Sequence, residues 1–270
     1  MSIISISRGS YSYGKETAEK LAAQLGYECI SREILLEASE QFHVPEIKLV
    51  HAIHDSPTIL DRFTFGKEKY IAFVRAALFH HLQKDNVIYH GLAGHFFLQN
   101  IPHVLKVRII ADMDRRIAIV MKRDQISEDA ARRILIKDDE ERRKWSHYLY
   151  GIDTTDSKLY DMVLRIGQLT VDDAIKLIAS AAEQPSFKTT AASQRMMDDM
   201  ALASQVEAEL VTEFPGASVS AEKGKVKVTV KGPIDKSETI TEQVKQIIVK
   251  REGIETIAVN VIQSALDVNF

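Results

Sequence analysis

Short apolar runs alternate with longer segments of helical periodicity along the first two thirds of the chain. Five of these runs have the composition of strands that are buried in a sheet: residues 3–6, 27–30, 87–91, 104–111 and 159–166. In the segments between them, apolar side chains recur at the spacing of one buried helix face. Strands that alternate with helices predict an α/β domain, with a parallel five-stranded sheet and helices on both of its faces.

Beyond residue 184 the pattern changes. Residues 185–193 include Pro185 and have no clear period, which is typical of a linker. A helical pattern over 196–211 is followed by two alternating segments around Glu222-Lys223-Gly224, which predict a hairpin. A further helix and the strand-like segment 256–262 complete a small α+β domain of order αββαβ. We therefore expect a first domain over 1–184, a linker over 185–193 and a second domain over 194–270.

The stretch between the first strand and the first helix has the features of a phosphate-binding loop. Gly9, Gly14 and Lys15 match the spacing G-x-x-x-x-G-K, in which glycines let the backbone turn and direct N–H groups inward. The helix N-terminus adds partial positive charge, and Lys15 adds a full charge for the outer phosphates of a nucleotide. The alternative is an ordinary strand-to-helix turn. The predicted nucleotide-binding residues are Gly9, Ser10, Tyr11, Ser12, Tyr13, Gly14, Lys15, Glu16 and Thr17.

The two positions after Lys15 depart from that pattern. Glu16 stands where the pattern has Ser or Thr, and Thr17 follows one residue later. A lysine and a threonine separated by one residue are also the spacing in nucleoside monophosphate kinases. We therefore expect Thr17 to position the α-phosphate or to hold Mg²⁺ through the nucleotide. Glu16 brings a carboxylate close to phosphates, so it must point away or help to hold a metal ion.

Composition limits the other functions that the chain could have. Its 270 residues are 45% apolar and 27% charged, which is ordinary for a globular protein of one large domain or two smaller ones. A net charge of −3 gives no argument for binding to nucleic acid or to a membrane surface. Cys29 is the single cysteine, so no intramolecular disulfide is possible. We find neither a signal peptide nor an apolar run of bilayer length, and we expect a cytoplasmic, enzyme-like protein.

The nine histidines invite a metal hypothesis, which their spacing disfavours. The sequence has no His-x-x-x-His motif with an acid, and cysteine partners are lacking. His90 is the exception, because His90 and Gly91 end the third predicted strand. Ligands of a parallel sheet bind at the carboxyl ends of its strands, so we expect His90 to contact an acceptor substrate.

Together these features resemble the P-loop nucleotide kinases, and most closely the cytidylate-kinase-like family. The resemblance covers about two thirds of the chain. The second domain is similar to BON-type domains in the order of its elements and the placement of its glycines. The segments that carry the kinase resemblance are residues 7–15, Gly26, 31–35, 87–94, 104–111 with Arg116, 137–142 and 159–161.

The resemblance implies ATP-dependent transfer of a phosphoryl group, with Mg²⁺, to a nucleoside monophosphate such as CMP or to a related small acceptor. It implies that Arg32 lies near the monophosphate and that a mobile lid closes over the site. The residues alone leave the lid open to question, since the helical stretch over 127–150 also fits a surface helix with internal ion pairs. The catalytic residues that the resemblance implies are Lys15, Arg116, Arg123, Asp139 and Arg142.

A departure from the family motivates a second hypothesis. His90-Gly91-Leu92 stands where cytidylate kinases carry Asp-Gly-Arg. In this hypothesis the protein is a catalytically altered nucleotide-binding regulatory module that signals through its C-terminal domain. A third hypothesis, a scaffold without a ligand, requires Lys15 to lie in a surface turn. The C-terminal domain has no cluster of catalytic residue types, and we expect it to bind a protein partner or to form a homo-oligomer.

Overall fold

The computed structural model describes residues 2–31, 66–91 and 94–263. The contacts between residues divide the chain into two compact units. The predicted domain boundaries at residues 184 and 194 follow the sequence pattern rather than these contacts, and they stay a prediction. Of the described residues, the N-terminal unit contains 2–31, 84–91 and 94–190, and the C-terminal unit contains 66–83 and 191–263.

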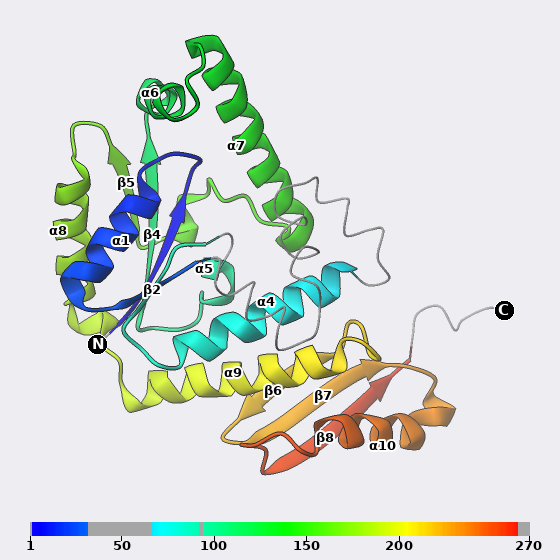
Figure 1. Ribbon diagram of the computed structural model, residues 1–270. Coiled ribbons are helices and arrows are strands. Elements are labelled where there is room, and N and C mark those ends of the chain that lie inside the picture. The colour runs from blue at the N-terminus through cyan, green and yellow to red at the C-terminus, as the bar shows by residue number, and fades with distance from the viewer. Residues whose placement is uncertain (1, 32–65, 92–93, 264–270) are drawn as a thin grey trace. The chain divides into compact units, whose positions relative to one another are not determined.

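A five-stranded parallel sheet forms the centre of the N-terminal unit (Figure 1). Its strands lie in the order β2-β3-β1-β4-β5, with β1 between β3 and β4. Because all five strands run in the same direction, their carboxyl ends meet at one edge of the sheet. This arrangement confirms the predicted α/β fold. The strands are β1 (Ile3–Arg8), β2 (Glu28–Ile30), β3 (Val87–Tyr89), β4 (Val104–Ala111) and β5 (Met162–Ile166).

Helices α1 and α8 cover one face of this sheet (Figure 1). Their buried side chains, among them Leu21 and Ile175, pack with Ile6, Val107 and Ile109 in one apolar cluster. Successive residues of a strand point to opposite faces, so the residues between these belong to the other face, where α5 contacts β1. The helices of this unit are α1 (Gly14–Leu25), α5 (Gly94–Phe97), α6 (Met113–Asp124), α7 (Glu128–Tyr150) and α8 (Val171–Ala182), with 3-10 turns at Ser157–Leu159 and Pro185–Phe187.

Helices α6 and α7 follow β4 and pack against each other. The first residue before α7 is Ser127, whose side chain accepts a hydrogen bond from the Ala130 N–H. The helix ends at Gly151, where a left-handed φ of 67° favours glycine. The helices predicted after the fourth strand are thus confirmed. A small apolar cluster joins the two helices, and its buried residues are Ile117, Val120, Ala131 and Leu135.

The C-terminal unit contains a three-stranded sheet of order β6-β7-β8. β6 and β7 are antiparallel, and the turn between them places Lys223 and Gly224 at φ values of 49° and 76°, as a two-residue hairpin turn requires. β8 pairs parallel to β7. These elements confirm the predicted αββαβ order. They are α9 (Ala191–Leu210), β6 (Ser218–Glu222), β7 (Lys225–Lys231), α10 (Ser237–Ile248) and β8 (Thr256–Ile262), with a 3-10 turn at Ile234–Lys236.

The same unit also includes α4 (Gly66–Leu82), which packs along α9. The Gln205 side chain, which is 8% exposed, donates a hydrogen bond to the Ala76 carbonyl at 3.2 Å. Arg75 and Glu207 form an ion pair of 3.1 Å between the two helices. α9 begins at Ala191, earlier than the predicted start at Met196, so its first turn takes up part of the predicted linker. Within the described ranges, no helix combines the length and the apolar character that crossing a bilayer requires.

Candidate functional site

The predicted phosphate-binding loop lies between β1 and α1, at the carboxyl edge of the sheet. Tyr11 and Tyr13 have positive φ values of 53° and 66°, which is uncommon for side chains of this size. A Cβ atom at Gly14 would lie 2.5 Å from the Cβ of Arg8, so this position accepts only glycine without rearrangement. A Cβ at Gly9 would meet only ordinary contacts. The tight part of the loop is therefore its junction with α1.

Hydrogen bonds hold this loop against β4. The Ser12 hydroxyl lies 2.9 Å from the Gly9 carbonyl and 3.0 Å from the Ile109 carbonyl, and it donates its proton to one of them at a time. The Gly9 N–H donates to the same Ile109 carbonyl at 3.4 Å. Because Ser10 and Ser12 are both buried, the shape of the loop is fixed by its own interior and by one residue of the neighbouring strand.

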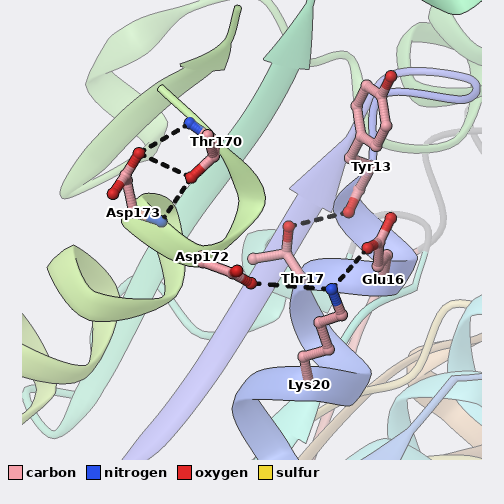
Figure 2. Close-up of polar contacts among 7 residues, drawn as sticks. All are labelled: Tyr13, Glu16, Thr17, Lys20, Thr170, Asp172 and Asp173. Carbon is pink, nitrogen blue, oxygen red and sulfur yellow. Dashed lines mark hydrogen bonds and ion pairs between the residues drawn. The ribbon is translucent and has the colours of Figure 1, made fainter. Parts of the chain in front are cut away.

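The charged residues that start α1 point along the helix surface. The Lys15 side chain is 65% exposed, and its ammonium lies 3.6 Å from Glu19. Glu16 forms an ion pair of 2.8 Å with Lys20, and this pair raises the pKa of Lys20 above its ordinary value. Figure 2 shows the Lys20 ammonium between Glu16 and Asp172, the latter on α8 and 3.7 Å away. The carboxylate of Glu16 is therefore partly neutralised, and the contact of Lys15 is loose enough for its ammonium to move.

Thr17 lies one residue further along α1 and is fully buried. Its hydroxyl donates a hydrogen bond to the Tyr13 carbonyl at 2.9 Å, as Figure 2 shows. A threonine hydroxyl that bonds back to the preceding turn is common inside helices. Here the bond fixes the first turn of α1, and a role of Thr17 in holding Mg²⁺ stays a prediction.

Arg116 of α6 connects the loop to both helices that follow β4. Its Nε donates to the Ser10 carbonyl at 2.7 Å, and its Nη2 donates to the Asp139 carboxylate on α7 at 2.8 Å. The residue is only 8% exposed, so this ion pair is screened less than a surface pair. Of the predicted residues, Arg116 thus contacts the loop directly, and Asp139 contacts Arg116.

Two further predicted arginines lie at the same place. Arg123 hydrogen-bonds the Tyr11 hydroxyl, and its guanidinium carbon lies 4.5 Å from the centre of the Tyr11 ring. Arg142 is half-buried on α7, and burial lowers its pKa, although the carboxylates of Asp138 and Asp139 oppose that shift. The structure therefore brings Arg116, Arg123, Asp139 and Arg142 together beside the loop. Their catalytic roles stay a prediction.

The predicted acceptor residues lie at the end of β3. His90 is 5% exposed, and its main-chain N–H donates to the Ile30 carbonyl at 3.0 Å. Gly91 leaves space for the buried Tyr89 ring, because a Cβ there would lie 1.9 Å from the Tyr89 hydroxyl oxygen. Arg32 lies outside the described residues.

Sequence reasoning missed a buried polar cluster on the face of the sheet that α5 contacts. The Tyr160 hydroxyl is its centre, at 3.2 Å from Ser7 Oγ, 3.2 Å from Arg108 Nη1 and 3.1 Å from His95 Nε2. Burial lowers the pKa of His95 to about 3, and the positive charges of Arg108 and Lys106 contribute to the shift. The sequence contained a signal for this cluster. Lys106 and Arg108 lie two residues apart in an otherwise apolar strand, so both belong to the same face of the sheet.

The C-terminal unit has a cavity of about 620 Å³ beside α9. Its carboxylates already accept hydrogen bonds: Asp198 from the Gln83 side chain at 3.2 Å, and Asp199 from the Lys223 main-chain N–H at 2.7 Å. The wall also carries Arg195 and Glu252, so charges of both signs line it. This balance points to no single class of ligand. In the described ranges, no group of three or more possible metal-binding side chains occurs.

Comparison with known proteins identifies relatives of the first domain. A model of the cytidylate kinase-like family matches residues 3–168. The chain is 25% identical over 166 residues to a cytidylate kinase of Methanoregula boonei, which covers 61% of this chain and 85% of that protein. It is 32% identical over 95 residues to a cytidylate kinase of Sulfolobus acidocaldarius, which covers 35% of this chain. The chain spans about half the length of the Sulfolobus protein, 52%.

A solved structure has the same fold as this part of the chain. It is an uncharacterized protein from Eubacterium ventriosum, with a TM-score of 0.50 and 21% identity. The match covers 68% of this chain and 99% of that one. The similarity of the second domain to BON-type domains stays a prediction.

Proposed function

Because the chain belongs to the cytidylate kinase-like family, we propose that it transfers the γ-phosphoryl group of ATP to a nucleoside monophosphate such as CMP, or to a related small acceptor. Membership of a kinase family implies the use of ATP and Mg²⁺ in general. The observation that carries the proposal is the loop over residues 9–14, which is held by β4 and contacted by Arg116 and Arg123.

The residues of the loop fit a polyphosphate. Ser10 Oγ is buried and has no hydrogen-bond partner in the part of the chain that the structure describes. A buried hydroxyl without a partner costs about 1–3 kcal/mol, and a phosphate oxygen would satisfy it. The N–H groups at the start of α1 add partial positive charge, and the exposed Lys15 ammonium is within a side-chain movement of the same place.

In the proposed reaction, an oxygen of the acceptor phosphate attacks the γ-phosphorus of ATP. The bond from that phosphorus to the β–γ bridging oxygen breaks, and its electron pair leaves with ADP. Catalysis of this step depends mainly on positioning and on positive charge around the transferred group. When bound with the nucleotide, Mg²⁺ would neutralise β- and γ-phosphate oxygens, and Thr17 is the residue that we propose to hold it.

Each of the positive residues has a role in this scheme. Lys15 contacts the transferred phosphoryl group, and Arg123 and Arg142 neutralise charge on its oxygens. Arg116 keeps the loop in shape through the Ser10 carbonyl while Asp139 orients its guanidinium. Movement of α6 and α7 would therefore change the loop and the arginines together.

The proposal is tested by measuring ADP release from ATP and Mg²⁺ with a panel of monophosphates that contains CMP, UMP, AMP and GMP. We expect turnover with at least one of them, and a loss of about 100-fold or more in the Lys15→Ala variant. Lys15 is exposed, so the variant should keep the circular dichroism spectrum and melting temperature of the wild type. Lys176→Ala, an exposed lysine on α8, is the matched control. Equal turnover in both variants would remove Lys15 from the mechanism.

The alternative function is a nucleotide-binding regulatory module without turnover. It is favoured by Thr17, whose hydroxyl is buried and bonded to the Tyr13 carbonyl. Tight binding of ATP, without release of ADP for any acceptor of the panel, would support this alternative against the kinase.

A further inference from the structure

Among the residues that the structure describes, half-buried Arg108 has no carboxylate partner. Its Nη1 donates to the Tyr160 hydroxyl at 3.2 Å and lies 3.5 Å from Ser7 Oγ, and both oxygens are uncharged. Within the ranges that the structure describes, no carboxylate is within ion-pair distance of this guanidinium. Its positive charge lowers the pKa of Asp153, but only as a contribution from a greater distance.

Two other partly buried cations of this unit, Lys106 and Arg116, are paired with carboxylates. Lys106 lies two residues earlier on the same strand and face, and its Nζ is 3.3 Å from the Asp161 carboxylate. Arg116 lies 2.8 Å from Asp139. Removing a charge from water costs several kcal/mol unless an opposite charge and hydrogen bonds compensate for it. Arg108 therefore differs from Lys106 and Arg116, because the described residues supply no carboxylate for its charge.

The cluster around Arg108 fixes the direction of its guanidinium. The Thr154 carbonyl can only accept, so the Tyr160 hydroxyl donates its single proton there, at 2.9 Å. The lone pairs of the same oxygen are then left for Arg108 Nη1 and for His95 Nε2, which must carry the proton of the neutral imidazole. His95 is 1% exposed and Tyr160 is 8% exposed, so neither side chain can turn away to water.

The position of Arg108 in β4 relates it to the phosphate-binding loop. Its neighbour in the chain, Ile109, accepts hydrogen bonds from the Gly9 N–H and the Ser12 hydroxyl. The side chain of Ile109 packs in the apolar cluster on the α1 side, so the side chain of Arg108 lies on the opposite face. An anion bound to Arg108 would thus approach the carboxyl edge of the sheet next to the loop and from the face away from α1.

We infer that Arg108 binds the phosphate group of the monophosphate acceptor, and that Tyr160 and His95 are positioning residues for its guanidinium. This inference rests on the proposed function and names the group that recognises the acceptor. Guanidinium N–H groups suit phosphate because two parallel hydrogen bonds form at once. The turn after β3 supplies no arginine for this purpose, since His90 is followed by Gly91 and Leu92.

The test compares CMP with cytidine, which differ only in the phosphate. Binding of each to the full-length protein is measured by titration calorimetry without ATP, in the wild type and in Arg108→Met. We expect the variant to bind CMP about 10- to 100-fold more weakly, and cytidine unchanged, because a charge-assisted contact to phosphate is lost. UMP, AMP and GMP serve as further probes with the same phosphate. Lys176→Met removes an exposed charge on the far face and is the matched control.

Two further variants separate binding from structure. Arg108→Lys retains the charge without the fork of donors, and we expect it to recover part of the lost CMP affinity. Tyr160→Phe keeps the ring and removes the hydroxyl that holds the guanidinium, and we expect a smaller loss of CMP affinity with cytidine again unchanged. A purely structural role for the cluster would weaken CMP and cytidine alike.

Three results would overturn the inference. They are equal weakening of CMP and cytidine in Arg108→Met, CMP affinity equal to that of the wild type in this variant, and no binding of any of the four monophosphates to the wild type. The proposed function fails in a different way. If monophosphates bind through Arg108 but ADP is never released, the kinase reaction is wrong and the phosphate site stands. If Arg108→Met releases ADP with the KM of the wild type for CMP, the reaction stands and the site is wrong.

Discussion

The two faces of the central sheet are made by the same strands, yet their buried side chains differ in kind. Toward α1 and α8, β1 and β4 present Ile6, Val107 and Ile109. On the opposite face the same strands present Ser7 and Arg108. The first face is satisfied by packing alone, whereas the second contains a charge that packing cannot satisfy. Burial by itself therefore does not distinguish residues that stabilise a fold from residues that bind a ligand.

The largest effect on stability should come from the apolar face. Ile6 is fully buried, so Ile6→Ala removes buried methyl and methylene groups and leaves a cavity. We expect the free energy of unfolding to fall by about 2–5 kcal/mol, measured by urea denaturation. The cytidine affinity of the protein that remains folded should not change. A loss below about 1 kcal/mol would mean that this face is packed loosely, and the contrast between the faces would disappear.

The contribution of the polar face to the free energy of unfolding should depend on pH. Burial lowers the pKa of His95 to about 3, assisted by Arg108 and Lys106. The folded-state pKa is below the ordinary value, so the stability that depends on neutral His95 is complete above about pH 6.5 and is lost as pH falls toward 3. We expect His95 to lower the free energy of unfolding by up to about 1.4 kcal/mol for each unit by which the pH falls in that window.

The measurement is urea denaturation of the wild type and of His95→Asn at pH 7, 6 and 5. The stability difference between them should shrink as the pH falls, because the variant has no imidazole to protonate. Parallel curves for the two proteins would show that His95 is not held neutral by its surroundings.

The smallest effect should come from Ser7, the neighbour of Ile6 in β1. Ser7→Ala removes a hydroxyl that lies 3.2 Å from the Tyr160 oxygen, while Arg108 and His95 retain their contacts with that oxygen. We expect a loss of about 0.5–1.5 kcal/mol in the free energy of unfolding, the usual net value of one hydrogen bond. A loss as large as that of Ile6→Ala would show that both faces serve stability equally.

The sequence allowed the fold and the loop between β1 and α1 to be predicted because both depend on local patterns. Phosphate binding by this loop stays a prediction. Apolar runs and helical periods each occur within a single element, and Gly9, Gly14 and Lys15 lie within one short segment of the chain. The steric need for Gly14 shows why the pattern is informative, since its backbone closely approaches the side chain of Arg8. Arg116 and Asp139 were singled out by the family resemblance and not by the local pattern, and the structure joins them by an ion pair.

Lys106 and Arg108 gave a signal in the sequence, but the assembly of the polar cluster could not be predicted because its members come from distant segments. Ser7, His95 and Arg108 belong to three elements, and Tyr160 precedes β5. The pairing of β1 with β4 and the position of α5 bring them together. The packing of α4 along α9 was not predicted for the same reason, since helical periodicity identifies a helix but not its neighbour. Arg32 lies outside the described residues.

The attachment of the loop to Ile109 has a consequence for how the two substrates would be spaced. The carbonyl that tethers the loop and the side chain of Arg108 belong to consecutive residues of a single strand. One peptide unit therefore acts as a fixed spacer between them, and its length is set by covalent geometry. Rotation or translation of α6 and α7 can open or close the surroundings of the loop, but it leaves the spacing between the Ile109 carbonyl and Arg108 unchanged.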